Sequence, residues 1–344
     1  MSNASDNQDL PVVVLSAGDV RGIGPEVLFK ALARNQFRAR LHPLVVGPAV
    51  ALRMQAVELW PAGDCPEMVR TALDNIVDIA EGGDSELESG SMSGIRTSLA
   101  GDETLAGRWA GRAVELAVEL IGRGAASALV TAPLDKHALN LAGYNYPGHT
   151  EMLAELSGGV DVSMMLAGGD LRVVPATTHV ALARVPSLVD RELIVRQCRV
   201  IDRGLKSVFG ITGPRIAVCG LNPHLGDGGV AGDEDQRITA PAVEDARAAG
   251  LDVAGPFPAD TVFVRAARGE FDAVLAMYHD QAMVAIKMHA FGGGVNVTLG
   301  LPFVRTSPDH GTALDIAGRG IADESSMAHA LELAVKSARL ENKG

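Results

Sequence analysis

Short apolar runs alternate along the chain with stretches of helical periodicity. Buried strands are indicated by short runs of four to six mainly apolar residues, at residues 12–15, 44–47, 127–132, 215–219 and 273–277. Helical stretches separate most of these runs, and one of them begins near Glu103. Such alternation is typical of a mostly parallel sheet that is covered by helices, so we expect an α/β fold.

Two segments in the middle of the chain depart from this alternation. Residues 162–167 and 171–176 are separated by Gly168-Gly169-Asp170, which favours a β-hairpin and therefore a partly antiparallel sheet. The pattern also predicts long amphipathic helices from Leu188 to Phe209 and from Glu324 to about Leu340. No internal repeat or low-complexity linker interrupts the chain, and residues 1–9 are expected to form a disordered tail.

Composition excludes several classes of protein. With 30 basic and 42 acidic side chains the formal net charge is −12, which argues against a nucleic acid or an anionic membrane as partner. The three cysteines have no spacing that suggests a disulfide framework, so we expect a reducing compartment. No signal peptide or membrane span is evident, and we predict a cytoplasmic protein. The 39 glycines and only 4% aromatic residues favour a glycine-turn-rich enzyme.

The first predicted strand is followed by a glycine-containing turn from Gly18 to Glu26. Glycines between a strand and a helix allow backbone N–H groups to approach an anion, but the spacing is not GxGxxG. The turn is either a phosphate site or a tight connection. Pro25 suits the first helical position, and Glu26 suits the positive end of the helix dipole.

A second candidate region combines residues 131–136 with residues 146–151. Both segments are junctions at strand ends or helix starts, where open α/β sheets bind their ligands. His149 and Thr150 place an imidazole beside a hydroxyl at a helix start. The alternative is a structural capping box that uses Thr150.

Three histidines each follow an apolar strand. His179, His224 and His279 come after residues 171–176, 215–219 and 273–277, and the carboxyl ends of parallel strands share one edge of a sheet. Three convergent imidazoles suit zinc or a similar divalent ion with an open coordination position. For any one histidine taken alone, a hydrogen-bonded structural role is favoured, and it is the occurrence of three in the same topological position that favours a metal site. The acidic cluster of residues 227–235 is expected to be a solvated loop with a helix N-cap, with cation binding as the alternative.

A last candidate segment extends from Lys287 to Gly320. Lys287 lies two helical turns after His279, so a helix that starts near Asp280 returns it to the same face. Asn296 and Arg305 are expected to flank a short strand and to bind a phosphate or carboxylate. His310 precedes a loop of small residues. A planar ring or a ribose can lie on this loop; the alternative is a plain glycine-bounded turn.

In this order the segments resemble the 4-hydroxythreonine-4-phosphate dehydrogenase family of pyridoxal phosphate biosynthesis from about Val12 to the last helix. The most specific matches are Gly148-His149-Thr150-Glu151, Thr177-Thr178-His179, Cys219-Gly220-Leu221-Asn222-Pro223-His224, Pro258-Ala259-Asp260-Thr261, Ala276-Met277-Tyr278-His279-Asp280-Gln281, Gly294-Val295-Asn296 and Asp309-His310-Gly311-Thr312-Ala313.

The resemblance implies a fold like that of isocitrate and isopropylmalate dehydrogenases. Two interleaved α/β/α lobes are expected, one from residues 10–133 with about 300–344 and the other from about 134–299, with the active-site cleft between them. The family further implies a homodimer whose active site lies at the subunit interface.

The resemblance also assigns roles to residues of this chain. It implies a divalent ion (Zn, Mg or Co) on His179, His224 and His279, and substrate contacts from His149, Thr150, Lys287, Asn296 and Arg305. It points to Lys287 and Asp260 as catalytic groups, and to Gly294, His310 and Asp315 as contacts of NAD or NADP. Because this superfamily binds the nucleotide without a Rossmann fingerprint, the missing GxGxxG is expected.

The implied reaction is the oxidation of 4-phosphooxy-L-threonine to a 3-keto acid, which decarboxylates to 3-amino-2-oxopropyl phosphate. Alternatives are a dehydrogenase of D-threonate or D-erythronate 4-phosphate and a non-catalytic ligand-binding homologue. Val20, Arg21 and Asp135 depart from the usual family pattern. A carboxylate at 135 near an anionic substrate is repulsive, although the extra cation at Arg21 partly compensates for it.

Overall fold

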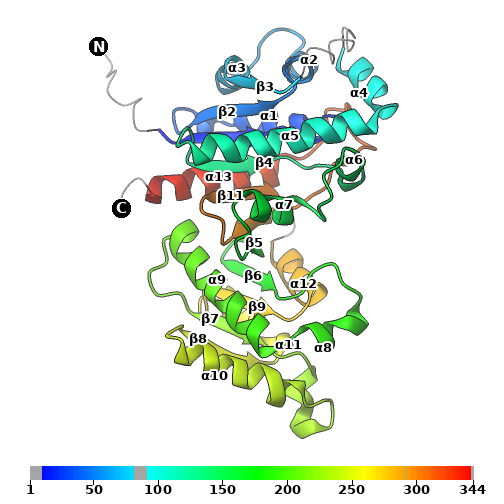
Figure 1. The fold of residues 1–344 in the computed structure, drawn as a ribbon. Helices are drawn as coiled ribbons and strands as arrows, with labels where there is room; N and C mark the ends of the chain where they lie inside the picture. Colours follow the sequence, from blue (N-terminus) through cyan, green and yellow to red (C-terminus); the bar gives the residue numbers. More distant parts are fainter. Residues whose placement is uncertain (1–9, 81–90, 291, 342–344) are drawn as a thin grey trace, which may run out of the picture. The chain divides into compact units, whose positions relative to one another are not determined.

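The computed structural model describes residues 10–80, 91–290 and 292–341 and is an α/β protein with mostly parallel strands, as the sequence predicts (Figure 1). The chain divides into two compact units, the first formed by residues 1–159 and 302–344 and the second by residues 160–301. The sequence predicts divisions near residues 133 and 300, so the second lies close to the observed one and the first lies about 26 residues before it. The tail expected at residues 1–9 lies outside the described residues.

Five parallel strands form the sheet of the first unit, in the order β3-β2-β1-β4-β11. The strands are β1 (Val12–Ser16), β2 (His42–Gly47), β3 (Ile76–Asp78), β4 (Ala128–Thr131) and β11 (Val304–Pro308). The helices described in this unit are α1 (Gly24–Leu32), α2 (Ala49–Leu59), α3 (Glu67–Asp74), α4 (Met92–Ala100), α5 (Glu103–Gly122), α6 (Lys136–Leu141), α7 (His149–Leu156) and α13 (Ser325–Glu341). A 3₁₀ turn spans Asn35–Phe37.

Local sequence explains where the main elements of this unit begin. Helix α1 has proline in its first turn, and α5 is capped by Asp102, whose side chain accepts a hydrogen bond from the Leu105 amide at 2.9 Å. Strand β4 is buried throughout, which is typical of a parallel strand covered on both faces. The predicted strands and the helix start near Glu103 are therefore confirmed.

The second unit has a mixed sheet in the order β10-β5-β6-β9-β7-β8. The predicted hairpin is confirmed as β5 (Ser163–Gly168) and β6 (Leu171–Pro175), and β10 (Val295–Leu299) is also antiparallel to β5. The remaining strands run parallel to β6 and are β9 (Ala273–Ala276), β7 (Ile216–Cys219) and β8 (Val253–Phe257). The helices are α8 (Val185–Leu188), α9 (Arg191–Phe209), α10 (Ala240–Ala248), α11 (Ala259–Ala267) and α12 (His279–His289), with short helical turns at Leu182–Arg184, Pro223–Gly229 and Asp235–Thr239.

The predicted helix from Leu188 is wrong in its first turn. Leu188 ends the short helix α8, and Val189 is extended. Asp190 then caps α9 by accepting a hydrogen bond from the Leu193 amide at 2.7 Å. When an aspartate side chain accepts a hydrogen bond from a backbone amide of the following turn, it favours a helix that begins there over a longer helix that runs through it. The periodicity of the apolar residues does not reveal this break.

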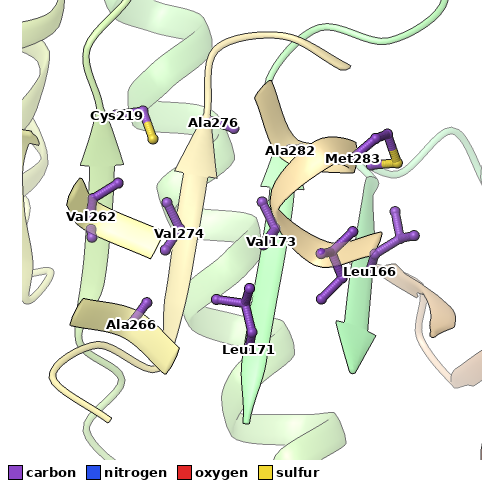
Figure 2. Packing of buried hydrophobic residues seen from close by; sticks show 12 residues of the cluster. Leu166, Leu171, Val173, Cys219, Val262, Ala266, Val274, Ala276, Ala282 and Met283 are labelled. Carbon is purple, nitrogen blue, oxygen red and sulfur yellow. The ribbon is translucent and has the colours of Figure 1, made fainter. Parts of the chain in front are cut away.

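The core of the second unit lies between its sheet and helices α11 and α12 (Figure 2). Val173 and Val274 point from neighbouring strands toward Val262 of α11 and Ala282 of α12, and all four side chains are fully buried. This packing fixes the helix that begins with His279 against the strands whose ends carry the other candidate ligands. Among the described helices, none has the length and apolar character that a membrane crossing requires.

Candidate active site

In the first unit, a buried arginine and a histidine lie at the ends of sheet and helix elements. Arg305 is 2% exposed within β11, and its Nη2 donates a hydrogen bond to Thr131 Oγ1, at the end of β4, at 2.6 Å. His149 is the first residue of α7, with Thr150 next to it. The helix N-cap is Gly148, which provides no side-chain cap, so the capping-box alternative for Thr150 is wrong.

Electrostatic interactions connect these groups into one cluster. Burial lowers the pKa of His149 well below 6.5, and the charges of Arg305 and Lys136 lower it further, so the imidazole is neutral at physiological pH. Burial lowers the pKa of Arg305 to about 10, which still leaves the guanidinium charged. Glu151 is the carboxylate that opposes this shift. These residues therefore offer a buried cation and polar side chains to a phosphate or carboxylate.

The glycine turn after β1 is a tight connection. The Asp19 amide donates to Pro133 O at 2.9 Å, and the Ile23 amide donates to Thr312 O at 2.9 Å. A Cβ atom on Gly22 would stand 2.4 Å from Thr312 O, which explains why the position has no side chain. The turn thus packs against the loop that begins at His310 rather than presenting its own amides to a ligand.

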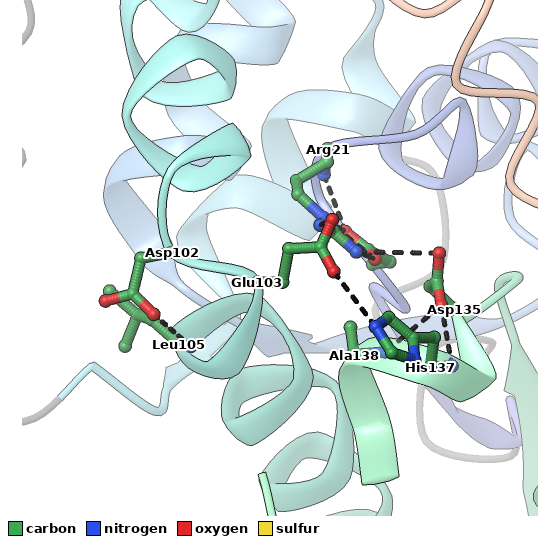
Figure 3. Close-up of polar contacts among 8 residues, drawn as sticks. Arg21, Asp102, Glu103, Leu105, Asp135, His137 and Ala138 are labelled. Atoms are coloured by element: carbon green, nitrogen blue, oxygen red, sulfur yellow. Dashed lines mark hydrogen bonds and ion pairs between the residues drawn. The ribbon is translucent and has the colours of Figure 1, made fainter. Parts of the chain in front are cut away.

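Arg21 occupies the same turn and is the centre of a carboxylate network (Figure 3). Its guanidinium is 5% exposed, forms three hydrogen bonds of 2.7–3.1 Å with the Asp19 carboxylate, and lies 3.3 Å from Glu103 Oε1 and 3.6 Å from Asp135 Oδ2. The hydrogen bond with Asp19 raises the pKa of Arg21, against the opposing effect of burial. The compensation between Arg21 and Asp135 expected from the sequence is therefore present as a direct ion pair.

Asp135 has a second role. Its Oδ1 accepts hydrogen bonds from the amides of His137 at 2.7 Å and Ala138 at 3.1 Å, so the carboxylate is the N-cap of α6 (Figure 3). The negative charge at this position is shared between a helix end and a guanidinium, which weakens its repulsion of an anion nearby.

The loop from His310 to Gly320 is fastened to α1 by a pair that sequence reasoning missed. Lys30 Nζ donates to Gly320 O at 2.7 Å, to Ala322 O at 3.0 Å and to Glu26 Oε1 at 2.7 Å. Glu26 is 1% exposed and also accepts a hydrogen bond from the Ala322 amide at 2.9 Å. The i,i+4 spacing of Glu26 and Lys30 signals an ion pair, but nothing in the sequence indicates their distant backbone partners.

His310 and Asp315, the predicted nucleotide contacts of this loop, differ in environment. The Nε2 atom of His310 is buried and has no hydrogen-bond partner among the described residues, while Nδ1 lies 3.1 Å from Gly311 O. Asp315 is exposed. Gly294, the third predicted contact, is buried in the second unit directly before β10.

In the second unit, the three candidate ligands follow three adjacent parallel strands. The register pairs Pro175 of β6 with Ala276 of β9, and Leu275 of β9 with Val218 of β7. Residues 179, 279 and 224 come shortly after these positions, so all three histidines stand at one edge of the sheet, as the sequence predicts.

Two of these histidines form a pair. The ring centroids of His179 and His279 are 5.7 Å apart with an interplanar angle of 41°, and His279 Nδ1 lies 2.7 Å from Asp280 Oδ1. Two imidazoles that share one tetrahedral ion have centroids roughly 5 Å apart, so this spacing suits a common ion. Both rings line a cavity of about 190 Å³ together with Thr177 and Tyr278.

The third histidine is not brought into this pair. His224 is exposed on a turn with left-handed backbone, and no group of three or more His, Cys, Asp or Glu side chains in the described residues is arranged to hold an ion. Imidazole nitrogens fit a first-row divalent ion, and His179 and His279 line the same cavity. Asp235, expected in a solvated acidic loop, is instead 1% exposed and does not cap its own helix.

The remaining predicted residues lie on well-defined elements. Helix α12 contains both His279 and Lys287, which confirms the predicted helix, and Lys287 is exposed. Asp260 is exposed in the first turn of α11. Asn296 and Arg305 do not flank one strand, because each lies inside its own, β10 and β11 respectively. The Oδ1 atom of Asn296 is buried with no hydrogen-bond partner among the described residues, which suits a ligand that donates a hydrogen bond.

Comparisons with known proteins show the family to which the chain belongs. Residues 40–334 match the family described as "Pyridoxal phosphate biosynthetic protein PdxA". The chain belongs to the PdxA family. The family resemblance seen in the sequence is thereby confirmed.

Curated relatives and solved structures extend this match over nearly the whole chain. A 4-hydroxythreonine-4-phosphate dehydrogenase of Geobacter metallireducens is 45% identical over 340 residues, covering 97% of each chain. A D-threonate 4-phosphate dehydrogenase of Cupriavidus necator is also 45% identical, over 96% of this chain and 99% of its own. The crystal structure of a 4-hydroxythreonine-4-phosphate dehydrogenase from Klebsiella pneumoniae superposes with a TM-score of 0.81 at 40% identity, covering 95% of this chain and 99% of that one. The prediction of a dehydrogenase that acts on a CH–OH group is confirmed.

Proposed function

We propose that this PdxA-family chain oxidises 4-phosphooxy-L-threonine with NAD or NADP in the presence of a divalent ion. The product is a 3-keto acid that decarboxylates to 3-amino-2-oxopropyl phosphate. The observation that carries the proposal is the combination of a buried arginine beside a neutral histidine, Arg305 and His149, with an imidazole pair, His179 and His279. The first pair suits an anion and the second a cation that binds oxygen.

The residues of the first unit would hold the anionic end of the substrate. The guanidinium of Arg305 is preorganised, because Thr131 and the surrounding core hold it in place before a ligand binds. His149 and Thr150 add neutral donors, since the low pKa of His149 keeps its ring uncharged. Asn296 belongs to the second unit, and there its buried Oδ1 would accept a hydrogen bond from the substrate.

The histidines of the second unit would hold the ion. A divalent ion lowers the pKa of a bound alcohol and withdraws electrons from the resulting ketone, while the nicotinamide accepts hydride. Lys287, two turns after His279 on α12, is the candidate for moving the proton of the substrate hydroxyl, and Asp260 is the second candidate. The loop that begins at His310 would take the adenosine side of the nucleotide, with Gly294 and Asp315 as further contacts.

A second copy of the chain would complete the set of three imidazoles. Helices α11 and α12 border a groove of about 780 Å³ that exposes apolar side chains, with Val284 64% and Met288 84% exposed. Tyr278 and Asp280 line both this groove and the cavity of the histidine pair. A homodimer that covers the groove would therefore lie next to the histidine pair, where the described residues of one chain provide no third ligand.

The dimer has its own test. Val284→Asp and Met288→Asp should shift the molecular mass in analytical ultracentrifugation from two copies to one and should weaken binding of Zn²⁺ or Co²⁺. Val57→Asp on α2 is the matched control, since Val57 is likewise exposed, at 58%. A wild-type protein that sediments as a single copy and binds the ion normally would contradict the dimer.

D-threonate and D-erythronate 4-phosphate are the competing substrates. The relative from Cupriavidus necator is as similar to this chain as the relative from Geobacter metallireducens. The Arg21–Asp135 ion pair gives a further reason to test both substrates, because it departs from the usual family pattern and changes the charge at the start of α6.

A substrate panel decides between these functions. The three phosphorylated acids are compared with NAD and with NADP in the presence of Zn²⁺, Mg²⁺ or Co²⁺, and reduced nicotinamide is followed by absorbance. The highest kcat/KM is expected for 4-phosphooxy-L-threonine. His279→Ala should abolish turnover, and His329→Ala, at an exposed position on α13, serves as its control. Inactivity toward all three substrates with a correctly folded dimer would favour a ligand-binding homologue instead.

A further inference from the structure

The turn that carries His224 has an unusual backbone. His224, Leu225, Gly226, Asp227 and Gly228 all have positive φ, between 45° and 82°. Three of the five are not glycine, and a left-handed conformation is costly for such residues. Runs of this kind persist only where surrounding contacts hold them, and they are concentrated at functional sites.

A buried carboxylate provides the strongest of these contacts. Asp235 is 1% exposed, its Oδ1 accepts the Leu221 amide at 2.7 Å, and its Oδ2 accepts the Asn222 amide at 2.9 Å. The Thr239 hydroxyl donates to Oδ1 at 2.9 Å. Both oxygens therefore hold the two residues that precede Pro223 and His224, and Asp235 itself lies at the start of a π-helical turn, a feature frequent at functional sites.

Two further side chains hold the same segment. The Asn222 side chain donates to Glu234 Oε2 at 2.8 Å. Gln281 of α12 donates to Gly220 O at 3.0 Å and accepts the Met277 amide at 2.6 Å. Gln281 thus connects the base of the His224 turn to the residues directly before His279.

We infer that Asp235 is a positioning residue: its carboxylate holds Leu221 and Asn222 and thereby presents His224 as the third imidazole, which one copy of the proposed dimer supplies to the ion on the His179–His279 pair of the other. The inference rests on the proposed function for the role of His224. The clamp itself follows from contacts within the second unit. Groups that orient a metal ligand commonly affect metal affinity although they do not touch the metal.

The test compares Asp235→Asn with Asp233→Asn. The amide at 235 keeps the size of the side chain but can accept a hydrogen bond at one position only, so one of the two backbone amides loses its acceptor. Asp233 is the matched control, because it is an exposed carboxylate two residues away that pairs only with Arg237 among the described residues. Thr239→Val removes one donor to Asp235 and serves as a milder variant if Asp235→Asn folds poorly.

Two readouts are followed on the full-length, metal-stripped protein. Hydrogen exchange at Leu221 and Asn222 should be faster in Asp235→Asn and unchanged in Asp233→Asn. Co²⁺ titration, monitored by its d–d absorption, should show affinity weakened about 10–100-fold for Asp235→Asn, a few-fold for Thr239→Val and less than twofold for the control.

The outcomes separate the clamp from the proposed function. Native exchange and native Co²⁺ affinity in Asp235→Asn would overturn the inference. Loss of Co²⁺ binding in His179→Ala together with normal binding in Asp235→Asn would also overturn it while leaving the metal site intact. If the wild-type protein binds no Co²⁺, the proposed metal site fails, and with it the role of His224 as its ligand, whereas the exchange data still decide whether Asp235 holds the turn.

Discussion

The Lys30→Met variant removes the ammonium that joins α1 to the loop between His310 and Ala322. Lys30 contacts two backbone carbonyls of that loop and the carboxylate of Glu26 at 2.7–3.0 Å. Methionine keeps most of the side-chain volume. The change therefore isolates the loss of charge and hydrogen bonds from the loss of packing.

The structure sets the expected magnitude. A hydrogen bond that involves a charged group contributes about 1.5–3 kcal/mol, and removal of one member of a buried ion pair costs about 3–5 kcal/mol. Glu26 is 1% exposed and loses its cation, but the Lys30 side chain is 21% exposed, which favours the lower end of this range. We expect the free energy of unfolding to fall by about 3 kcal/mol, which lowers the urea midpoint by about 1 M if the slope is about 3 kcal/mol/M.

A double-mutant cycle with Glu26→Gln measures the pair itself. We expect a coupling energy of at least about 1.5 kcal/mol, against less than about 0.5 kcal/mol for the exposed i,i+4 pair Glu119–Arg123 at the end of α5. Because the loop is proposed to bind the nucleotide, Lys30→Met should also raise the KM for NAD more than the KM for the phosphorylated substrate. A coupling energy as small as that of the control pair would refute the reasoning.

Three further predictions concern individual side chains. Because burial holds the pKa of His149 well below 6.5, the folded protein takes up fewer protons than the unfolded chain at acidic pH. The free energy of unfolding should therefore fall by up to about 1.4 kcal/mol per pH unit below about pH 6.5, and less steeply in His149→Asn. Urea unfolding that gives the same dependence on pH for both proteins would contradict this. Arg21→Met should cost about 3 kcal/mol or more in chemical unfolding, with Arg21→Lys restoring less than half because one ammonium cannot replace the guanidinium fork; full rescue by lysine would contradict the pairing. Near pH 8, a thiol reagent should modify only Cys65 of the folded protein's three cysteines. Burial raises the pKa of Cys198 to about 12 and also raises the pKa of Cys219, so these two thiols remain protonated. Rapid reaction of all three would contradict this and show that the surroundings of Cys198 and Cys219 open to solvent.

Much of the sheet is predictable because its parallel strands are short and fully buried. Residues 216–219 and 273–276 read as apolar runs, and the polar residues that follow them lie at one edge because parallel strands end together. This reasoning places His179, His224 and His279 at that edge. It does not decide whether the three rings meet, since that depends on the conformation of the loops that carry them.

Other features depend on contacts that no local pattern encodes. Asp235 is one of four acidic residues between positions 227 and 235, and only the structure shows that it is buried against Leu221 and Asn222. The partners of Lys30 lie 290 residues further along the chain. The break before α9 depends on a single capping aspartate, which a helical periodicity from Leu188 does not reveal.

The order of segments along the chain has a consequence for synthesis. The first unit is interrupted after residue 159 and resumes at residue 302, so β11 can pair with β4, and Arg40 with Glu332, only when translation is nearly finished. The second unit is continuous and can fold on the ribosome while β4 still lacks its neighbour. Nascent chains that terminate before residue 302 would therefore leave an open strand edge, a form that invites aggregation and recognition by chaperones.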